Sequence, residues 1–252
     1  MNHFLKIPKP AQGRRFVIAD IHGCYQTFRY LVLEKISLEK NDQLFLLGDY
    51  IDRGPDSAKV LDFIMQLQEK GFQVFPLRGN HEDDMLGDWQ FYKNLQTVKN
   101  YETFIERQFL NNSQTLLNDR GALKDKYFYF LQDLPYYYEL DDYYLVHAGF
   151  NMNAPDPFID YENMLWIRTF IHKKRKMNKL NGKKVVVGHT VQLLSFIQER
   201  IAQDHVVIPL DNACYYGYKY KNDPDIRDLS KFGNLCALNL DSMELYVQPN
   251  ID

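Results

Sequence analysis

Five short apolar runs in the sequence each end directly in a cluster of glycine, acidic, histidine or asparagine residues. In open α/β sheets, ligands bind at the carboxyl ends of the strands, where side chains from several strands meet. Glycine in such clusters lets the backbone turn sharply and approach a bound group closely. The pattern therefore predicts an α/β fold with one shared crevice. The clusters are Asp20-x-His22-Gly23, Gly48-Asp49-x-x-Asp52-Arg53-Gly54, Gly79-Asn80-His81-Glu82, His147-Ala148-Gly149 and Gly188-His189.

Apolar periodicity predicts strands that alternate with helices in the first half of the chain. Strands are expected at 16–19, 44–47 and 72–77, with helical spacing from Phe28 and a second helix opening at Pro55. This order is typical of βαβ units and a parallel sheet.

The second half is predicted to be mostly strands, after a polar and helical stretch from about residue 82 to 131. Asp141-Asp142 is expected to form a hairpin turn, and a helix is expected around Leu165, Trp166 and Arg168. Without a linker between the halves, we expect a single domain of residues 1–252, with two sheets flanked by helices. The expected strands are 136–140, 143–147, 184–188, 205–210, 235–240 and 243–247.

Overall composition argues against several classes of protein. Thirty basic and 33 acidic side chains leave a net charge of -3, which makes nucleic acid or an anionic membrane an unfavourable generic partner. No run approaches the roughly 18 apolar residues that a membrane span needs, and residues 1–15 do not resemble a signal peptide. Three scattered cysteines are too few for a disulfide framework or a cysteine zinc site. We therefore expect a cytoplasmic protein.

The clusters offer carboxylate, imidazole and amide ligands in combination. This mixture suits Mn²⁺, Fe²⁺ or Zn²⁺ better than Ca²⁺ or Mg²⁺, which prefer oxygen ligands. The ligand types therefore predict a site for divalent ions of this kind.

The five motifs, in this order and spacing, closely resemble the phosphoprotein phosphatase family within the calcineurin-like metallophosphoesterases. The resemblance covers roughly residues 14–215, and the short chain is similar to the bacterial and bacteriophage lambda branch. It implies a two-sheet β-sandwich flanked by helices (αββα), with the stretch 82–131 as a helical insertion. Asp211-Asn212-Ala213 stands where many members have Asp-Thr-Gly.

The resemblance also implies a role for each motif residue. Two divalent ions are expected as cofactors, Mn²⁺ first, with iron or zinc open. Hydrolysis is expected by direct attack of a hydroxide between the ions, with His81 as the general acid and Asp52 orienting it. The expected metal ligands are Asp20, His22, Asp49 as the bridge, Asn80, His147 and His189, and the expected phosphate-binding residues are Arg53, Arg78 and Arg168.

Other polar and aromatic residues have simpler interpretations. Glu82 is expected to be an acid in the first turn of a helix, and Cys24 a buried structural thiol. The basic segment 172–184 is expected to be solvated, with an acidic phosphopeptide or nucleotide as the alternative partner. For the tyrosines after Asp211, substrate contact and surface packing stay equally open. They are Tyr215, Tyr216, Tyr218 and Tyr220.

Two substrate classes remain for such an enzyme. The leading prediction is a serine/threonine protein phosphatase acting on phosphorylated protein or peptide, with phosphotyrosine open. The alternative is a symmetrical diadenosine tetraphosphatase or another nucleotide phosphohydrolase. The helical segment 82–131 and the tyrosine loop after Asp211 would decide between them. A stacking aromatic near a pocket would favour nucleotides, whereas an open groove would favour polypeptide. A nuclease is disfavoured by the absence of a basic stripe, and a non-catalytic scaffold by the complete ligand set.

Overall fold

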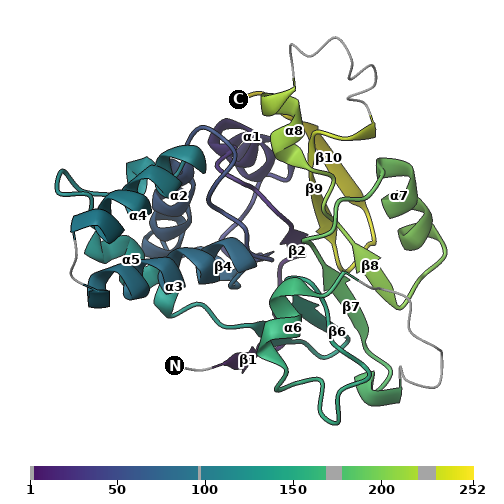
Figure 1. The fold of residues 1–252 in the computed structure, drawn as a ribbon. Helices are drawn as coiled ribbons and strands as arrows, with labels where there is room; N and C mark the ends of the chain where they lie inside the picture. The colour runs from purple at the N-terminus through teal and green to yellow at the C-terminus, as the bar shows by residue number, and fades with distance from the viewer. Residues whose placement is uncertain (1–2, 96–97, 169–177, 221–230) are drawn as a thin grey trace.

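The computed structural model describes residues 3–95, 98–168, 178–220 and 231–252, which form two sheets with helices outside them (Figure 1). In these ranges, no helix combines the length and the apolar character that crossing a membrane requires.

The first sheet has the strand order β10-β9-β2-β3-β4. Its parallel core is β2 (Arg15–Ile18), β3 (Gln43–Leu46) and β4 (Gln73–Pro76). Helix α1 (Tyr25–Tyr30), which continues as a π-helix over Leu31–Lys35, and helix α2 (Ser57–Glu69) form the crossovers. The predicted βαβ units are therefore confirmed. Strands β9 (Asn234–Asn239) and β10 (Leu245–Pro249) complete the sheet in antiparallel pairing.

The second sheet has the order β1-β5-β6-β7-β8. The predicted hairpin is present, because β5 pairs antiparallel with β6 on either side of Asp141-Asp142. Strand β1 was not predicted, since its side chains are exposed and it lies at the sheet edge. The strands are β1 (Phe4–Lys6), β5 (Tyr137–Glu139), β6 (Tyr143–Val146), β7 (Lys184–Val187) and β8 (Val207–Pro209).

Alternation along β2 shows how the layers pack. Phe16 and Ile18 belong to the core beneath α1 and α2, whereas Val17 belongs to the core shared with the second sheet. The side-chain period of two in a strand separates the faces in this way. The second sheet contributes Leu145 and Val186 to the shared core, and its outer face packs on α6 (Tyr161–Trp166). The expected αββα layering is therefore observed.

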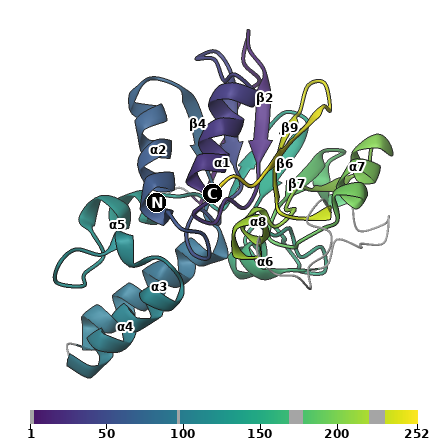
Figure 2. The ribbon, with the colours of Figure 1, turned by 90° about the horizontal axis from the view of Figure 1, so that it is seen from above.

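The stretch predicted to be helical contains α3 (Asn80–Leu95), α4 (Val98–Leu110), a 3-10 turn η2 (Gln114–Leu116) and α5 (Asp125–Gln132). Figure 2 shows α3 and α4 alongside each other and projecting from the body of the protein. The remaining helices are α7 (Leu194–Ala202) and α8 (Cys214–Lys219). The helix predicted to include Arg168 ends earlier, at Trp166, so Arg168 follows it as irregular chain.

Arg15 ties the two sheets together at the start of β2. Its guanidinium donates to both oxygens of Asp142, at 2.7 and 2.8 Å, in the β5–β6 turn. It also donates to Asp241 after β9, at 2.8 Å. The Arg15 side chain is 2% exposed, and its planar fork satisfies carboxylates from both sheets at once.

We predict that Arg15→Met lowers the free energy of unfolding by about 1–3 kcal/mol at neutral pH, because two carboxylates lose their charged donor. Burial alone would raise the pKa of Asp142 and Asp241, but Arg15 brings both below the usual value. The stabilisation is therefore present at neutral pH and is lost as the pH falls below about 3.9.

Urea denaturation across this pH range measures the difference. Lys9→Met is the matched control, since Lys9 pairs with the same Asp241 from a side chain that is 54% exposed. Equal effects of the two substitutions would contradict the assigned role of Arg15.

Candidate metal centre

The predicted crevice forms where strand ends from both sheets meet. Segments after β2, β3, β4, β6 and β7 bring the six expected metal ligands into buried positions. Several of these residues have left-handed backbone, with φ between 46° and 68°. This conformation is costly for residues other than glycine and is typical of functional sites. The residues with positive φ are His22, Asp49, Asp52, Arg53 and His189.

The fit around Asp20 explains one glycine of the motifs. A Cβ atom on Gly188 would lie 2.1 Å from Asp20 Oδ2, so only glycine fits there. The backbone N–H of His189 then donates to both Asp20 carboxylate oxygens at 3.0 Å. The motif after β7 is thereby bound to the motif after β2.

His22, Asp49 and His81 form the first group that could hold a metal ion, with ligand atoms within 4.8 Å of one another. His22 Nδ1 lies 2.9 Å from the carbonyl oxygen of Ile51. Because a carbonyl only accepts, Nδ1 carries the proton and His22 Nε2 presents a lone pair. A metal-binding histidine typically donates its other ring N–H to a carbonyl in this way. The free Nε2 lies 3.5 Å from Asp49 Oδ2.

Asp49, His147 and His189 form the second group. His147 Nδ1 donates to the carbonyl of Leu47 at 2.8 Å, which leaves its Nε2 as a lone pair. That lone pair lies 3.0 Å from Asn80 Oδ1 and 3.2 Å from His189 Nδ1. The lone pairs of His147 Nε2 and Asn80 Oδ1 therefore face each other, an arrangement that a cation between them would stabilise. The donor set fits a divalent ion.

Asp49 lies between the two groups. Its Oδ2 faces His22 at 3.5 Å, and its Oδ1 faces His147 at the same distance. Burial would raise the pKa of Asp49, but the charge of protonated His81 and the backbone N–H that His81 donates to Asp49 Oδ1 lower it below the usual value. The carboxylate is therefore ionised, with one oxygen available to each group.

Burial keeps the surrounding imidazoles neutral. It lowers the pKa of His22 well below the usual value, with Arg53 adding to the effect. Burial and His147 lower the pKa of His189 to about 3, and among the described residues its buried Nε2 has no hydrogen-bond partner. Neutral imidazole is the form that binds metals.

Asp211 is a further acidic residue of the centre that the sequence interpretation did not include among the ligands. Burial raises its pKa to about 6, despite the donated N–H of Ala213. Burial, Asp211 and Asp49 together raise the pKa of Asp20 well above its usual value. A divalent cation would relieve this repulsion. The sequence pattern that identified the other ligands also applies to Asp211, because this acidic residue follows the apolar strand β8.

His81, the third member of the first group, forms a pair with Asp52. His81 Nδ1 lies 2.6 Å from Asp52 Oδ2, and the hydroxyl of Ser113 donates to the other oxygen of Asp52. Burial would lower the pKa of His81, but Asp49 and Asp52 raise it to about 9. This pair therefore holds a proton at neutral pH, with Nε2 facing Asp49 at 3.9 Å.

Arg53 lies across the first group. Its two terminal nitrogens lie 2.9 Å from His22 Nε2 and 3.0 Å from His81 Nε2. Its guanidinium stacks on the ring of Tyr215, 4.7 Å from the centroid. One tyrosine of the loop after Asp211 therefore contacts the centre, whereas Tyr216 packs edge to face against Tyr220.

The other two expected phosphate-binding arginines are placed differently. Arg78 pairs with Asp83 at 2.9 Å and donates to the carbonyl of Gln132 at 2.8 Å. These contacts direct it toward the end of α5, which does not support the clamp role expected for it. Arg168 is exposed, and its charge is a smaller contributor, after burial and His147, to the lowered pKa of His189.

Glu82 does lie in the first turn of α3, as predicted, but its carboxylate has a larger structural role. The side chain is fully buried. Its Oε2 accepts the backbone N–H groups of Asp49 and Gly79, at 2.8 and 2.9 Å. Its Oε1 accepts those of Tyr50 and Ile51, at 2.8 and 3.3 Å. Glu82 therefore holds the loop that presents the shared carboxylate.

Two further sequence predictions concern Cys24 and the basic segment 172–184. Cys24 is buried and unoxidised, as expected, with the amide of Asn250 donating to its sulfur at 3.2 Å. Residues 172–177 of the basic segment 172–184 lie outside the described residues, so the solvated character predicted for the segment stays a prediction. In the described remainder, Lys183 pairs with Glu139 and Lys184 pairs with Asp204.

We predict that Glu82→Gln lowers the free energy of unfolding by about 1–3 kcal/mol, because the amide NH₂ would face backbone N–H donors in a buried position. Thermal or urea denaturation of the metal-free protein measures this. Glu69→Gln, at an exposed position in α2, should change stability by less than about 0.5 kcal/mol. An unchanged Glu82→Gln protein would show that these four hydrogen bonds are dispensable.

Parts of this chain are similar in sequence to known proteins. A symmetrical bis(5'-nucleosyl)-tetraphosphatase of Wigglesworthia glossinidia brevipalpis is 38% identical over 92 residues, which cover 36% of this chain and 31% of that protein. The protein of the same name from Buchnera aphidicola subsp. Acyrthosiphon pisum (strain 5A) is 43% identical over 72 residues, 28% of this chain and 25% of that protein. The matches thus span less than a third of each relative.

Solved structures resemble the whole chain. A protein described as a diadenosine tetraphosphatase has a TM-score of 0.62 at 20% identity, with 100% of both chains covered. A serine/threonine phosphatase of Saccharomyces cerevisiae, similar to human phosphatase PP5, has a TM-score of 0.61 at 15% identity, covering 100% of this chain and 84% of that one. Such low identities establish the fold alone.

A protein-family model also matches most of the chain, in agreement with the motifs, the layered fold and the ligand groups. The calcineurin-like phosphoesterase family model matches residues 13–234, which include every motif residue discussed above. The chain therefore belongs to the calcineurin-like phosphoesterase family.

Proposed function

We propose that this protein is a divalent-metal-dependent hydrolase that cleaves dinucleoside tetraphosphates symmetrically, into two nucleoside diphosphates. The observation that carries the substrate class is the name shared by the curated relatives, symmetrical bis(5'-nucleosyl)-tetraphosphatase. The site itself supports phosphoester or phosphoanhydride hydrolysis in general. The alternative from the sequence is therefore preferred to the leading prediction, a serine/threonine phosphatase, which has support only from the fold.

The two ligand groups would hold two divalent ions. We assign Asp20, His22 and Asp49 to one ion, and Asn80, His147 and His189, again with Asp49, to the other. Bound ions would lower the pKa of a water molecule and offset the charge of the phosphate. The shared Asp49 fixes both groups relative to each other, because its two oxygens face different histidines.

His81 would protonate the leaving oxygen. Its Nδ1–H is held by Asp52, which leaves Nε2 as the position from which a proton is delivered. Asp52 is itself fixed, since its backbone N–H is bonded to the hydroxyls of Ser57 and Ser113. Of the two carboxylates that raise the pKa of His81, Asp49 would be offset by the bound ions, whereas Asp52 would still favour the protonated acid.

Arginines would bind the phosphate oxygens. The fork of Arg53 lies between His22 and His81, and stacking on Tyr215 fixes its plane. Arg168 is exposed near His189 and would contact the substrate from the second group. Arg78 has no part in this proposal, because Asp83 and the end of α5 occupy its guanidinium.

We predict that wild-type protein loaded with Mn²⁺ binds two ions per chain, and that Asp49→Asn weakens binding of both, because each group loses the charge of one shared oxygen. Metal content after gel filtration, with calorimetric titration, measures this. His189→Ala should affect one ion alone. Retention of both ions by Asp49→Asn would contradict the bridging assignment.

The substrate is tested by initial rates of the Mn²⁺-loaded protein on diadenosine tetraphosphate and on a phosphothreonine peptide. We predict faster cleavage of the dinucleotide, with adenosine diphosphate as the product. His81→Asn should lower the rate by about 10²–10⁴-fold, the usual contribution of a general acid. His205→Asn is the matched control, because His205 is exposed and its ring bonds only Arg200 among the described side chains.

Faster cleavage of the peptide would overturn the substrate assignment and restore the protein phosphatase prediction. Activity that survives His81→Asn unchanged would overturn the role of His81 on either substrate.

A further inference from the structure

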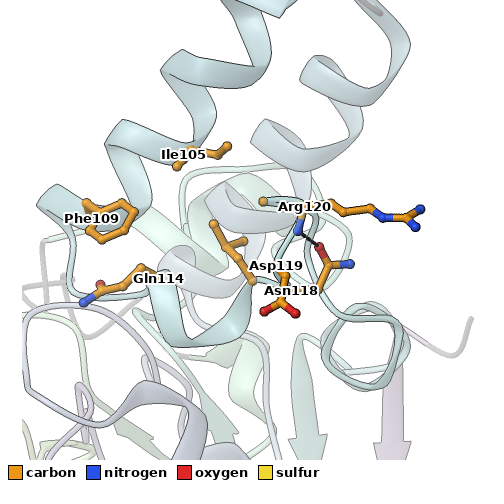
Figure 3. A pocket seen from close by; sticks show the side chains of 8 residues that line it. Ile105, Phe109, Gln114, Asn118, Asp119 and Arg120 are labelled. Atoms are coloured by element: carbon orange, nitrogen blue, oxygen red, sulfur yellow. Dashed lines mark hydrogen bonds between the residues drawn. The ribbon is translucent and has the colours of Figure 1, made fainter.

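Cavities lie on two faces of α4. The larger, of about 400 Å³, is lined by Ile105 and Phe109 together with the turn 118–121, and none of its lining residues belongs to the metal centre (Figure 3). The smaller, of about 170 Å³, is bordered by Asp52 and His81, the pair proposed to deliver a proton to the leaving oxygen. A group attached to that oxygen therefore adjoins the smaller cavity, which we call the leaving-group cavity.

The leaving-group cavity extends along α3, away from the candidate acid. His81, Asp84 and Asp88 recur on one face of this helix, at the three- and four-residue spacing of helix neighbours. The helix rises by roughly 10 Å from His81 to Asp88, at about 1.5 Å per residue, so the lining continues beyond the position of the leaving oxygen. From α4 and the chain that follows it, the lining adds Arg107, Gln108 and Asn111.

One carboxylate of this cavity lacks a partner. Asp52 pairs with His81, and Asp88 pairs with Arg107, whose Nη1 lies 2.9 Å from Oδ1 and 2.7 Å from Oδ2. Among the described residues, the Asp84 carboxylate has neither an ion pair nor a hydrogen bond, and burial raises its pKa despite the charges of His81 and Arg107. Partly buried acids normally accept hydrogen bonds, so Asp84 requires a donor from a bound group.

Gln108 presents an amide to the same cavity. The residue is only 2% exposed, but its side-chain amide makes no hydrogen bond with another described residue. Neither amide atom is sealed from solvent, so the amide opens into the cavity that the residue lines. What occupies the cavity therefore has to satisfy this amide as well.

These two side chains favour a ligand with hydroxyl groups. The Asp84 carboxylate only accepts hydrogen bonds, whereas the Gln108 amide also donates them. A hydroxyl donates and accepts, and so satisfies both, whereas an ammonium or guanidinium group only donates.

The size and lining of the cavity point to a sugar. Its volume is below the range of about 300–1,000 Å³ that is typical of sites for whole small molecules. The lining includes no Phe, Tyr or Trp side chain on which a base could stack. A sugar fits these limits better than a complete nucleoside does.

The cavity is joined to the proposed phosphate-binding arginine. The backbone carbonyl of Asn111 accepts the N–H of Arg53 at 2.8 Å, and the amide of Asn112 donates to the carbonyl of Arg53 at 3.1 Å. The segment that borders the cavity therefore also fixes Arg53. A ligand whose phosphate binds Arg53 can extend into the cavity beside it.

We propose that the leaving-group cavity binds the ribose of the leaving nucleoside diphosphate. The 2′- and 3′-hydroxyls donate to the Asp84 carboxylate, a contact that acidic residues make with ribose in other nucleotide sites, and one of them accepts from the Gln108 amide. This inference rests on the proposed function, because it assigns a place to the sugar of one half of the dinucleotide.

The test is a cycle that changes the protein and the substrate in turn. Mn²⁺-loaded wild type, Asp84→Asn and Gln108→Leu are assayed on diadenosine tetraphosphate and on its analogue with 2′,3′-dideoxyribose at both ends. The ratio of the two kcat/KM values is compared between proteins, so that general damage to the metal centre cancels. Asp83→Asn is the matched control, since Asp83 is the neighbouring acid of α3, pairs with Arg78 at 2.9 Å and does not line the cavity.

We expect the wild type and Asp83→Asn to prefer the ribose substrate by at least roughly tenfold, which corresponds to about 1.4 kcal/mol. Asp84→Asn should reduce this preference to about twofold or less, because a neutral amide replaces the charged acceptor. Gln108→Leu should reduce it in part. An equal preference in Asp84→Asn and the wild type, or no preference in the wild type, would overturn the inference.

A basic side chain of a phosphopeptide is the competing occupant. It is tested with two phosphothreonine peptides, one with arginine and one with alanine beside the phosphothreonine. A wild-type preference for the arginine peptide that Asp84→Asn abolishes would show that the cavity binds a cation, and would overturn the ribose assignment.

Failure of the proposed function would be distinguishable. If the wild type cleaves no dinucleotide, the Kd values of adenosine diphosphate and of its 2′,3′-dideoxy form, measured by calorimetry on the same proteins, still decide about the cavity. A ribose preference that Asp84→Asn abolishes would support the cavity assignment in an enzyme with another nucleotide substrate. Equal Kd values for the two nucleotides in the wild type would overturn the cavity assignment as well.

Discussion

The burial of several carboxylates at one point is the constraint on which the rest of the structure depends. Asp20, Asp49 and Asp211 lie in the same crevice, and burial together with their mutual repulsion raises the pKa of Asp20 and Asp211. The neighbouring histidines are kept neutral by burial and so supply electron pairs in place of charge. Such a group is costly alone and favourable around divalent cations, so metal binding and stability of the folded crevice are expected to be coupled.

The scaffold holds this arrangement by joining loops from both sheets. Glu82 binds four backbone N–H groups around the β3 and β4 ends, and the backbone of His189 binds Asp20 across the sheets. The left-handed backbone at several motif residues carries a cost, which these hydrogen bonds offset. At the start of β2, away from the crevice, Arg15 joins the two sheets through Asp142 in the β5–β6 turn and Asp241 after β9. Rigid strands and tightly held loops therefore place the ligands.

The helical segment is joined to the centre by a side-chain hydrogen bond. It contacts the centre through Ser113 on Asp52, and it carries the cavity beside Phe109 and Gln114.

The sequence by itself determined the strand–helix order, the two-sheet layering and the ligand types, because strand periodicity and residue chemistry are local properties. Five motifs at strand ends were enough to predict a shared crevice, and the family match agrees with the motifs. Only the tertiary structure decided which oxygens face which histidines, that Glu82 is an internal anchor and that Arg78 points toward α5. It also decided that Asp211 joins the centre and that α4 and η2 enclose a cavity. These facts depend on contacts between residues far apart in the chain, where side-chain direction is set by packing and not by neighbouring residues.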